Sequence, residues 1–133
     1  MDDRDGTMFV ADHENHRIVA LKPDDHVERV VAGGHGQGNG LDQLNGPTDV
    51  LIDKYNNSLV ISDQNNRRVM RWSLENGTTH GETVIMNIGC RGLAMDNDGA
   101  LYVGDVEKHE MRRYPIGDPA GHVVVGGNGR IIE

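Results

Sequence analysis

Hydrophobic and polar positions alternate in short runs along the whole chain. β-Prone runs are divided by clusters of Gly, Asn, Asp and Pro at a spacing of about 8–12 residues, and no ten-residue stretch has the periodicity of a helix. This pattern predicts an all-β protein whose strands are short and whose connections are rich in turns.

The predicted strands fall into three groups. They are expected at about 7–11, 16–21 and 27–32 in the first group; 48–53, 58–62, 67–73 and 83–87 in the second; and 91–96, 100–104, 110–114 and 122–126 in the third. The first group lacks the opening strand of the other two. Asn76-Gly77 is expected to form the hairpin turn between the last two strands of the second group, because both residues tolerate positive φ.

The three groups are copies of one repeat. Three 13-residue windows align, FVADHENHRIVAL at 9–21, VISDQNNRRVMRW at 60–72 and YVGDVEKHEMRRY at 102–114. Asp12, Asp63 and Asp105 hold the same place in these windows, so the periods are 51 residues (12 to 63) and 42 residues (63 to 105). We therefore divide the chain into repeat 1 at about 1–46, repeat 2 at about 47–89 and repeat 3 at about 90–133. Periods of this length are typical of propeller blades.

Some strands are apolar on both faces. Leu59-Val60-Ile61 and Val123-Val124-Val125 need a cover on each side, and blades stacked face to face around an axis provide it. We therefore expect about three four-stranded antiparallel blades, the first of them incomplete, in a partial β-propeller. A β-sandwich is the alternative.

Composition narrows the classes of function. The chain has 133 residues, 18 of them Gly, and a formal net charge of −8, which repels a phosphate backbone unless the cations gather on one surface. RNA binding is therefore disfavoured. The single cysteine, Cys90, excludes an internal disulfide and two-cysteine zinc motifs. Neither a signal peptide nor a membrane-spanning segment is visible, and the compartment stays open.

The repeat resembles the NHL repeat. The resemblance rests on the pattern Asp-x-x-Asn-His/Arg-Arg-Ile/Val, which a polar-Gly turn precedes and which Ala-Gly-Gly-x-Gly-x-Gly and Asn-x-Pro follow. The first copy matches closely and the second well, whereas the third has Lys108 for Asn and Glu110 for Arg. The resemblance implies a propeller that commonly closes with six blades and acts as a platform for protein or RNA. Some relatives are enzymes, such as the peptidylglycine amidating lyases.

Three repeats do not close a ring of six blades. The chain is expected to be a fragment of a larger propeller or a half-propeller completed by a second copy, and either further blades or self-association are needed to close the ring.

The recurring polar residues are expected to serve the architecture. An Asp at the end of a strand accepts hydrogen bonds from the turn that follows, and Arg17 and Arg68 can reach such an Asp in their own or a neighbouring blade. A catalytic residue is needed once, whereas a blade fastener is needed in every blade. The positions assigned to this role are Asp12, Asp63, Asp105, Asn15, Asn66, Arg17 and Arg68.

No cofactor or metal is expected. His13-x-x-His16 is the only close pair among seven histidines and lacks a zinc motif, while Asp3-Arg-Asp5-Gly6 and Asp96-Asn-Asp98-Gly99 lack a full calcium loop and are better explained as turns. The stretch 33–40 meets neither nucleotide fingerprint and is expected to be a flexible interblade loop. No catalytic triad can be assigned.

Binding is the function that these residues favour, with a protein partner as the first choice and without catalysis. The alternatives are an RNA-binding rim and a fragment of a propeller enzyme, such as a metal-dependent amidating lyase or a lactonase. The candidate residues for a partner-binding rim are His35, Arg67, Arg71, Trp72 and Arg91.

Overall fold

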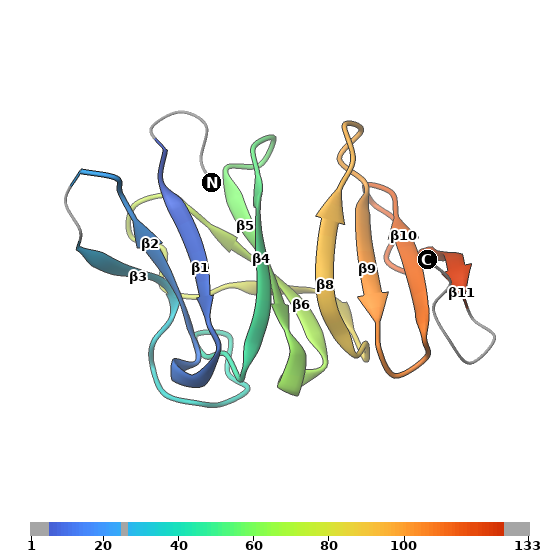
Figure 1. Ribbon diagram of the computed structural model, residues 1–133, viewed down its shortest axis with the longest axis horizontal. Helices are drawn as coiled ribbons and strands as arrows, with labels where there is room; N and C mark the ends of the chain where they lie inside the picture. The colour runs from blue at the N-terminus through green and yellow to red at the C-terminus, as the bar shows by residue number, and fades with distance from the viewer. Residues whose placement is uncertain (1–5, 25–26, 127–133) are drawn as a thin grey trace.

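The computed structural model describes residues 6–24 and 27–126, which form three separate antiparallel sheets (Figure 1). Sheet 1 contains β1 (Met8–Asp12), β2 (Arg17–Leu21) and β3 (Glu28–Gly33). Sheet 2 contains β4 (Pro47–Asp53), β5 (Ser58–Asp63), β6 (Arg68–Ser73) and β7 (Glu82–Met86). Sheet 3 contains β8 (Cys90–Met95), β9 (Leu101–Asp105), β10 (Glu110–Tyr114) and β11 (His122–Gly126).

Each sheet is a meander in which consecutive strands pair. The first strand of each sheet lies on one side of the molecule, where β4 runs between β1 and β8 (Figure 1). Each sheet also has a β-bulge at the same repeat position, after Ile18, Val69 and Met111. The sheets therefore fan out as blades of a propeller do, and the protein has an all-β, propeller-like fold.

Sheet 2 is covered on both faces. Leu59 and Ile61 of β5 pack with Phe9 and Ile18 of sheet 1, whereas Val60 of the same strand packs with residues of sheet 3. Every residue of β5 is buried, which confirms that an apolar run of this kind needs a cover on each side. The corresponding run in β11 lies at the end of the stack, and Val123 and Val124 are each 41% exposed.

The eleven predicted strands are confirmed, each within one residue at either end. The expected turn at Asn76-Gly77 is present, but it is part of a longer connection and only one of its two residues has positive φ. The connection from β6 to β7 spans 74–81, and of the two residues only Gly77 has positive φ, at 85°. A hydrogen bond from Thr78 N to Glu75 O closes a local turn within this connection. None of the helices in the described ranges has the length and apolarity that a bilayer crossing requires.

The structure has two short 3-10 segments that the sequence pattern did not predict. One follows β1 in sheet 1 and the other follows β5 in sheet 2, which are equivalent strands of the repeat. The two segments are η1 (His13–Asn15) and η2 (Gln64–Asn66), and each ends at a residue in the left-handed conformation, His16 and Arg67. This geometry turns the chain back within a few residues and brings the Asp before it close to the Arg after it.

Candidate functional site

Asp63 is the centre of a buried hydrogen-bond network at the end of β5. Its carboxylate accepts bonds from Arg68 Nε at 2.7 Å, Asn66 Nδ2 at 2.8 Å and the backbone amide of Asn45 at 2.7 Å. The Asp63 side chain is fully buried, so its charge is compensated by donors rather than by water.

Arg68 extends this network to the glycine-rich connector between sheets 1 and 2. Its guanidinium donates to the carbonyls of Asn39, Gly40 and Gln43 at 2.9–3.1 Å. Asn66 adds a bond to Gly38 O at 2.8 Å. The expectation of a flexible loop is therefore corrected, because hydrogen bonds hold this connector against sheet 2.

The first copy of the motif keeps the internal pair. Arg17 Nε donates to Asp12 at 2.8 Å, and Asn15 bonds the same carboxylate. The bond from Arg17 lowers the pKa of Asp12 below its usual value, and Asn15 adds to the effect. Both ends of the pair are almost one-third exposed, whereas Asp63 and Arg68 are buried.

The third copy replaces the pair. Asp105 accepts the backbone amides of Glu107 and Lys108 at 3.0 and 3.2 Å, which caps the turn without an arginine. Glu110, at the position of Arg68, pairs instead with Arg112 at 3.2 Å. Among the described residues, the assigned positions of repeats 1 and 3 hold turns within their own repeat, whereas Asp63, Asn66 and Arg68 of repeat 2 bind the connector at the end of repeat 1.

Other residues join sheet 2 to sheet 3. Thr48 Oγ1 donates to Arg91 O at 2.9 Å, Ser62 Oγ to Cys90 O at 3.1 Å, and Asp49 accepts the amide of Leu93 at 2.9 Å. Sequence reasoning missed these residues, because each bond joins two positions that are far apart in the sequence. The separations are 43, 28 and 44 residues, in the same order.

An exposed ion pair also links the two sheets. Arg67, whose backbone has the left-handed conformation, binds Glu107 through two guanidinium nitrogens. The shortest distance, from Nη2 to Oε1, is 2.7 Å. This bond lowers the pKa of Glu107 and raises the pKa of Arg67. Glu107 stands at the place of Asn65 in the second repeat, so the repeat pattern did not single it out.

The candidate rim residues do not form one surface. Trp72 is only 2% exposed and packs in the core between sheets 1 and 2, which corrects its assignment to a rim. Arg71 bonds Asp53 and Ser58 at the end of sheet 2 away from Arg67. His35 is exposed and its Nδ1 donates to Asp42 O at 3.0 Å. Arg71 and Trp72 are separated because neighbours along β6 point to opposite faces of the sheet.

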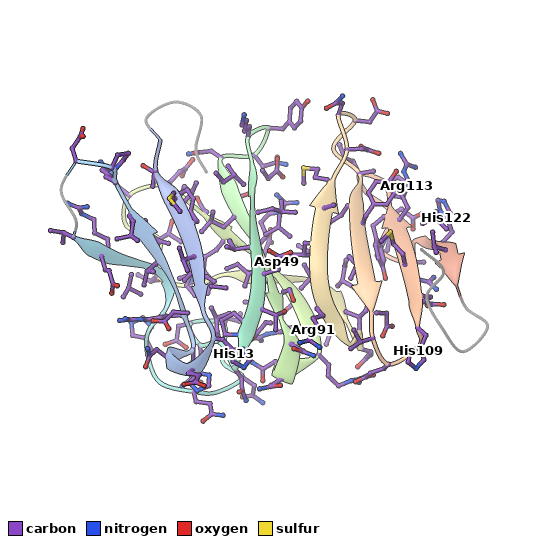
Figure 2. The ribbon with its side chains drawn as sticks, viewed as in Figure 1. His13, Asp49, Arg91, His109, Arg113 and His122 are labelled. Carbon is purple, nitrogen blue, oxygen red and sulfur yellow. The ribbon has the colours of Figure 1, made fainter. Side chains whose placement is uncertain are left out.

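A polar cavity of about 530 Å³ lies where the lower ends of the three sheets meet. Arg91 of β8 and His13 of η1 both point to this side of the molecule (Figure 2). The residues that line it are Ala11, His13, Pro47, Thr48, Gln64, Asn65 and Arg91.

A second, more apolar cavity of about 360 Å³ lies between sheets 2 and 3 at the opposite end of the strands. Val84, Leu101 and Tyr114 contribute apolar walls, and the Asp53–Arg71 pair lies at its edge. Burial alone would raise the pKa of Asp53, but its hydrogen bonds from Asn56 and Arg71 outweigh that effect and lower it.

The histidine pair serves the connector between sheets 1 and 2. His13 Nδ1 donates to Pro47 O at 3.3 Å, and His16 Nδ1 accepts the backbone amide of Gly46 at 2.9 Å. Within the described ranges, no three His, Cys, Asp or Glu side chains gather into a group that could hold a metal.

Burial raises the pKa of Cys90 to about 11, which leaves this thiol protonated at neutral pH.

The candidate calcium stretches have different outcomes. Asp96 accepts the amides of Asp98 and Ala100 at 3.0 Å each, so its carboxylate closes the expected turn. The other stretch begins at Asp3 and, up to residue 5, lies outside the described residues.

Comparison with known proteins identifies the fold alone. No family model and no curated protein matches the chain. A protein of unknown function from Bacteroides thetaiotaomicron superposes on 95% of this chain with a TM-score of 0.74 and 16% identity, and a putative exported protein from Bacteroides fragilis superposes on 96% with a TM-score of 0.66 and 10% identity. The chain covers 34% and 35% of those two proteins, so it is similar in fold to about a third of each.

Proposed function

We propose that the chain is a non-catalytic module of an NHL-type propeller that closes with six blades, and that it binds other proteins. The observation that supports this proposal is that the recurring polar residues bind one another and the connector. Asp63 and Arg68 are buried and occupied by the connector, and Asp12 and Arg17 hold each other. The motif therefore acts as scaffold, which leaves the exposed loops and the polar cavity as the surface for recognition.

The arrangement of cations favours protein over RNA as the partner. Arg67 precedes β6, Arg71 lies within it, and each is paired with a carboxylate, while the buried Trp72 offers no face for base stacking. With a net charge of −8, the chain also lacks the general attraction for phosphate on which RNA binding depends.

A peptide-display selection against the immobilised chain tests this proposal. We expect peptides that bind in solution, measured by fluorescence anisotropy, while a labelled pool of random RNA does not bind at about 0.15 M salt. An unrelated acidic protein of similar size serves as the control surface. Failure to enrich any peptide over this control, or saturable RNA binding that weakens steeply with salt, would contradict the proposal.

Elemental analysis of the purified chain tests the non-catalytic part. We expect no stoichiometric zinc, because His13 and His16 are engaged with the backbone at Pro47 and Gly46. One zinc per chain that survives dialysis would instead favour a propeller enzyme of the lyase type.

A further inference from the structure

Arg91 differs in its pairing from six other arginines of the described residues. Six arginines each form an ion pair with a carboxylate, namely Arg17, Arg67, Arg68, Arg71, Arg112 and Arg113. In residues 6–24 and 27–126, the Arg91 guanidinium has no carboxylate partner and no hydrogen bond, although acidic residues outnumber basic ones by 21 to 13 in the chain. Its charge is therefore available to a ligand.

The backbone that carries Arg91 is held in place. Thr48 Oγ1 binds the Arg91 carbonyl and Ser62 Oγ binds that of Cys90, while β8 pairs with β9 on its other side. The side chain itself is exposed. A fixed backbone with a free guanidinium reduces the entropy that is lost when the arginine binds a partner.

The polar cavity offers further hydrogen-bond groups beside this arginine. Gln64 also lines the cavity, and its side-chain amide makes no hydrogen bond in the part of the chain that the structure describes. His13 forms a wall, with Nδ1 committed to Pro47 O. Arg91 and Gln64 together supply N–H donors to one polar cavity of about 530 Å³, which is large enough for an amino-acid side chain.

The charge and geometry indicate the chemistry of the ligand. A guanidinium binds a carboxylate through two parallel N–H···O bonds, and the amide of Gln64 can donate a third. Asp49, the nearest acidic residue on β4, already accepts the amides of Val50 and Leu93. A single carboxylate matches the one free guanidinium of this cavity, whereas the rest of this acidic chain repels a polyanion.

We propose that the cavity beside Arg91 binds an acidic side chain of a protein partner. This proposal rests on the proposed function as a protein-binding module, and it names the chemistry that the partner presents. The site has one strong anchor and is open to solvent, so an isolated carboxylate binds weakly, with a Kd on the order of millimolar.

A nuclear magnetic resonance titration of the labelled chain tests the site. The probes are a capped tripeptide with a central Glu, its Gln counterpart and inorganic phosphate. We expect saturable shifts at Arg91 Nε–H and the Gln64 side-chain amide with the Glu peptide, and at least about tenfold weaker binding of the Gln peptide.

Matched variants separate the site from general electrostatics. Arg91→Gln should abolish the shifts at Gln64, while Lys22→Gln removes the same charge from an exposed position beyond β2 and should leave them unchanged. The amide spectrum of each variant reports whether it is folded. Equal binding of the Glu and Gln peptides, tighter binding of phosphate than of the Glu peptide, or unchanged binding by Arg91→Gln would each overturn the proposal.

The display experiment distinguishes the two proposals. If enriched peptides bind but are insensitive to Arg91→Gln, the Arg91 site is wrong as the recognition site and the binding function stands. If no peptide is enriched while the Glu tripeptide shifts Gln64 in an Arg91-dependent way, the carboxylate site stands and the platform function is wrong.

Discussion

At the scale of single residues, Asp12 and Asp63 hold the same repeat position but have different surroundings. The Asp63–Arg68 ion pair is buried and binds the connector, whereas Asp12 and Arg17 are partly exposed and form an ion pair with each other. The connector supplies three carbonyl acceptors to Arg68 that Arg17 does not have in the described residues. The same motif therefore contributes different stabilities in two copies.

The first prediction compares three variants of this position. Asp63→Ala should lower the free energy of unfolding by about 3 kcal/mol, because it leaves a buried guanidinium without its carboxylate. Asp12→Ala should cost about 1 kcal/mol or less, since water replaces its partner. Asp105→Ala, which releases two backbone amides but no arginine, should fall between them. Urea denaturation measures all three, and equal midpoints for the three variants would contradict this explanation.

The second prediction concerns acid. The pKa of Asp53 in the folded chain lies below the ordinary value of 3.8, so its ionised form stabilises the fold above that pH. This stabilisation is lost as the pH falls through about 4 and below. Asp53→Asn should therefore be less stable than the parent at neutral pH, and its stability should change less between about pH 5 and pH 3.

Urea denaturation across that range checks the second prediction. Asp24→Asn, at an exposed position after β2, is the matched control and should follow the parent. If Asp53→Asn loses as much stability on acidification as the parent, the pair with Arg71 does not account for the acid sensitivity.

At the scale of elements, the connector after β3 depends on one backbone conformation. Gly33 has a φ of 67°, and a Cβ at this position would lie 2.6 Å from His16 O. Gly77, in the connection from β6 to β7, has a similar φ of 85°, but a Cβ there would meet nothing within 4 Å. The two glycines share the requirement for positive φ and differ in the space around them.

The third prediction uses this difference. Gly77→Ala should cost about 1 kcal/mol from the left-handed backbone alone. Gly33→Ala adds a clash with a backbone carbonyl and should cost at least about 2 kcal/mol. Thermal denaturation of the two variants measures the contrast. Equal losses would mean that the connector can move away from His16 without penalty.

At the scale of the whole molecule, the two outer faces of the stack differ from the inner ones. Met8, Val10 and Val30 of sheet 1 are 38–49% exposed. In sheet 3, Val125 pairs with Met111 on the face away from sheet 2 and is partly exposed. The faces between the sheets bury comparable residues in two continuous clusters. Apolar sheet faces and free strand edges favour association.

The fourth prediction follows from these faces. The 133-residue chain should self-associate in a concentration-dependent way, which light scattering over a dilution series measures. Val10→Lys combined with Val125→Lys should weaken the association, whereas Met86→Lys, at a residue 70% exposed on β7, should not. A compact monomer of 14.6 kDa at tens of micromolar would contradict this prediction.

The strands and their grouping could be predicted from the sequence because they depend on local properties. Side chains alternate along a strand with a period of two, and Gly, Asn and Asp interrupt the runs wherever the chain turns. The spacing of the repeat is enough to place Asp12, Asp63 and Asp105 at equivalent turns. The bonds of Asp12 to Arg17 and of Asp63 to Arg68 span only five residues and followed from the same reasoning.

Only the tertiary structure decided which of these groups are buried, paired or free. Trp72 and Arg71 are neighbours in sequence, yet one lies in the core and the other at an ion pair, because successive strand residues face opposite sides. Arg91 lacks a carboxylate among the described residues because no acidic side chain of the other strands reaches it. Pairing over such distances depends on how the sheets pack against one another, which local sequence pattern does not contain.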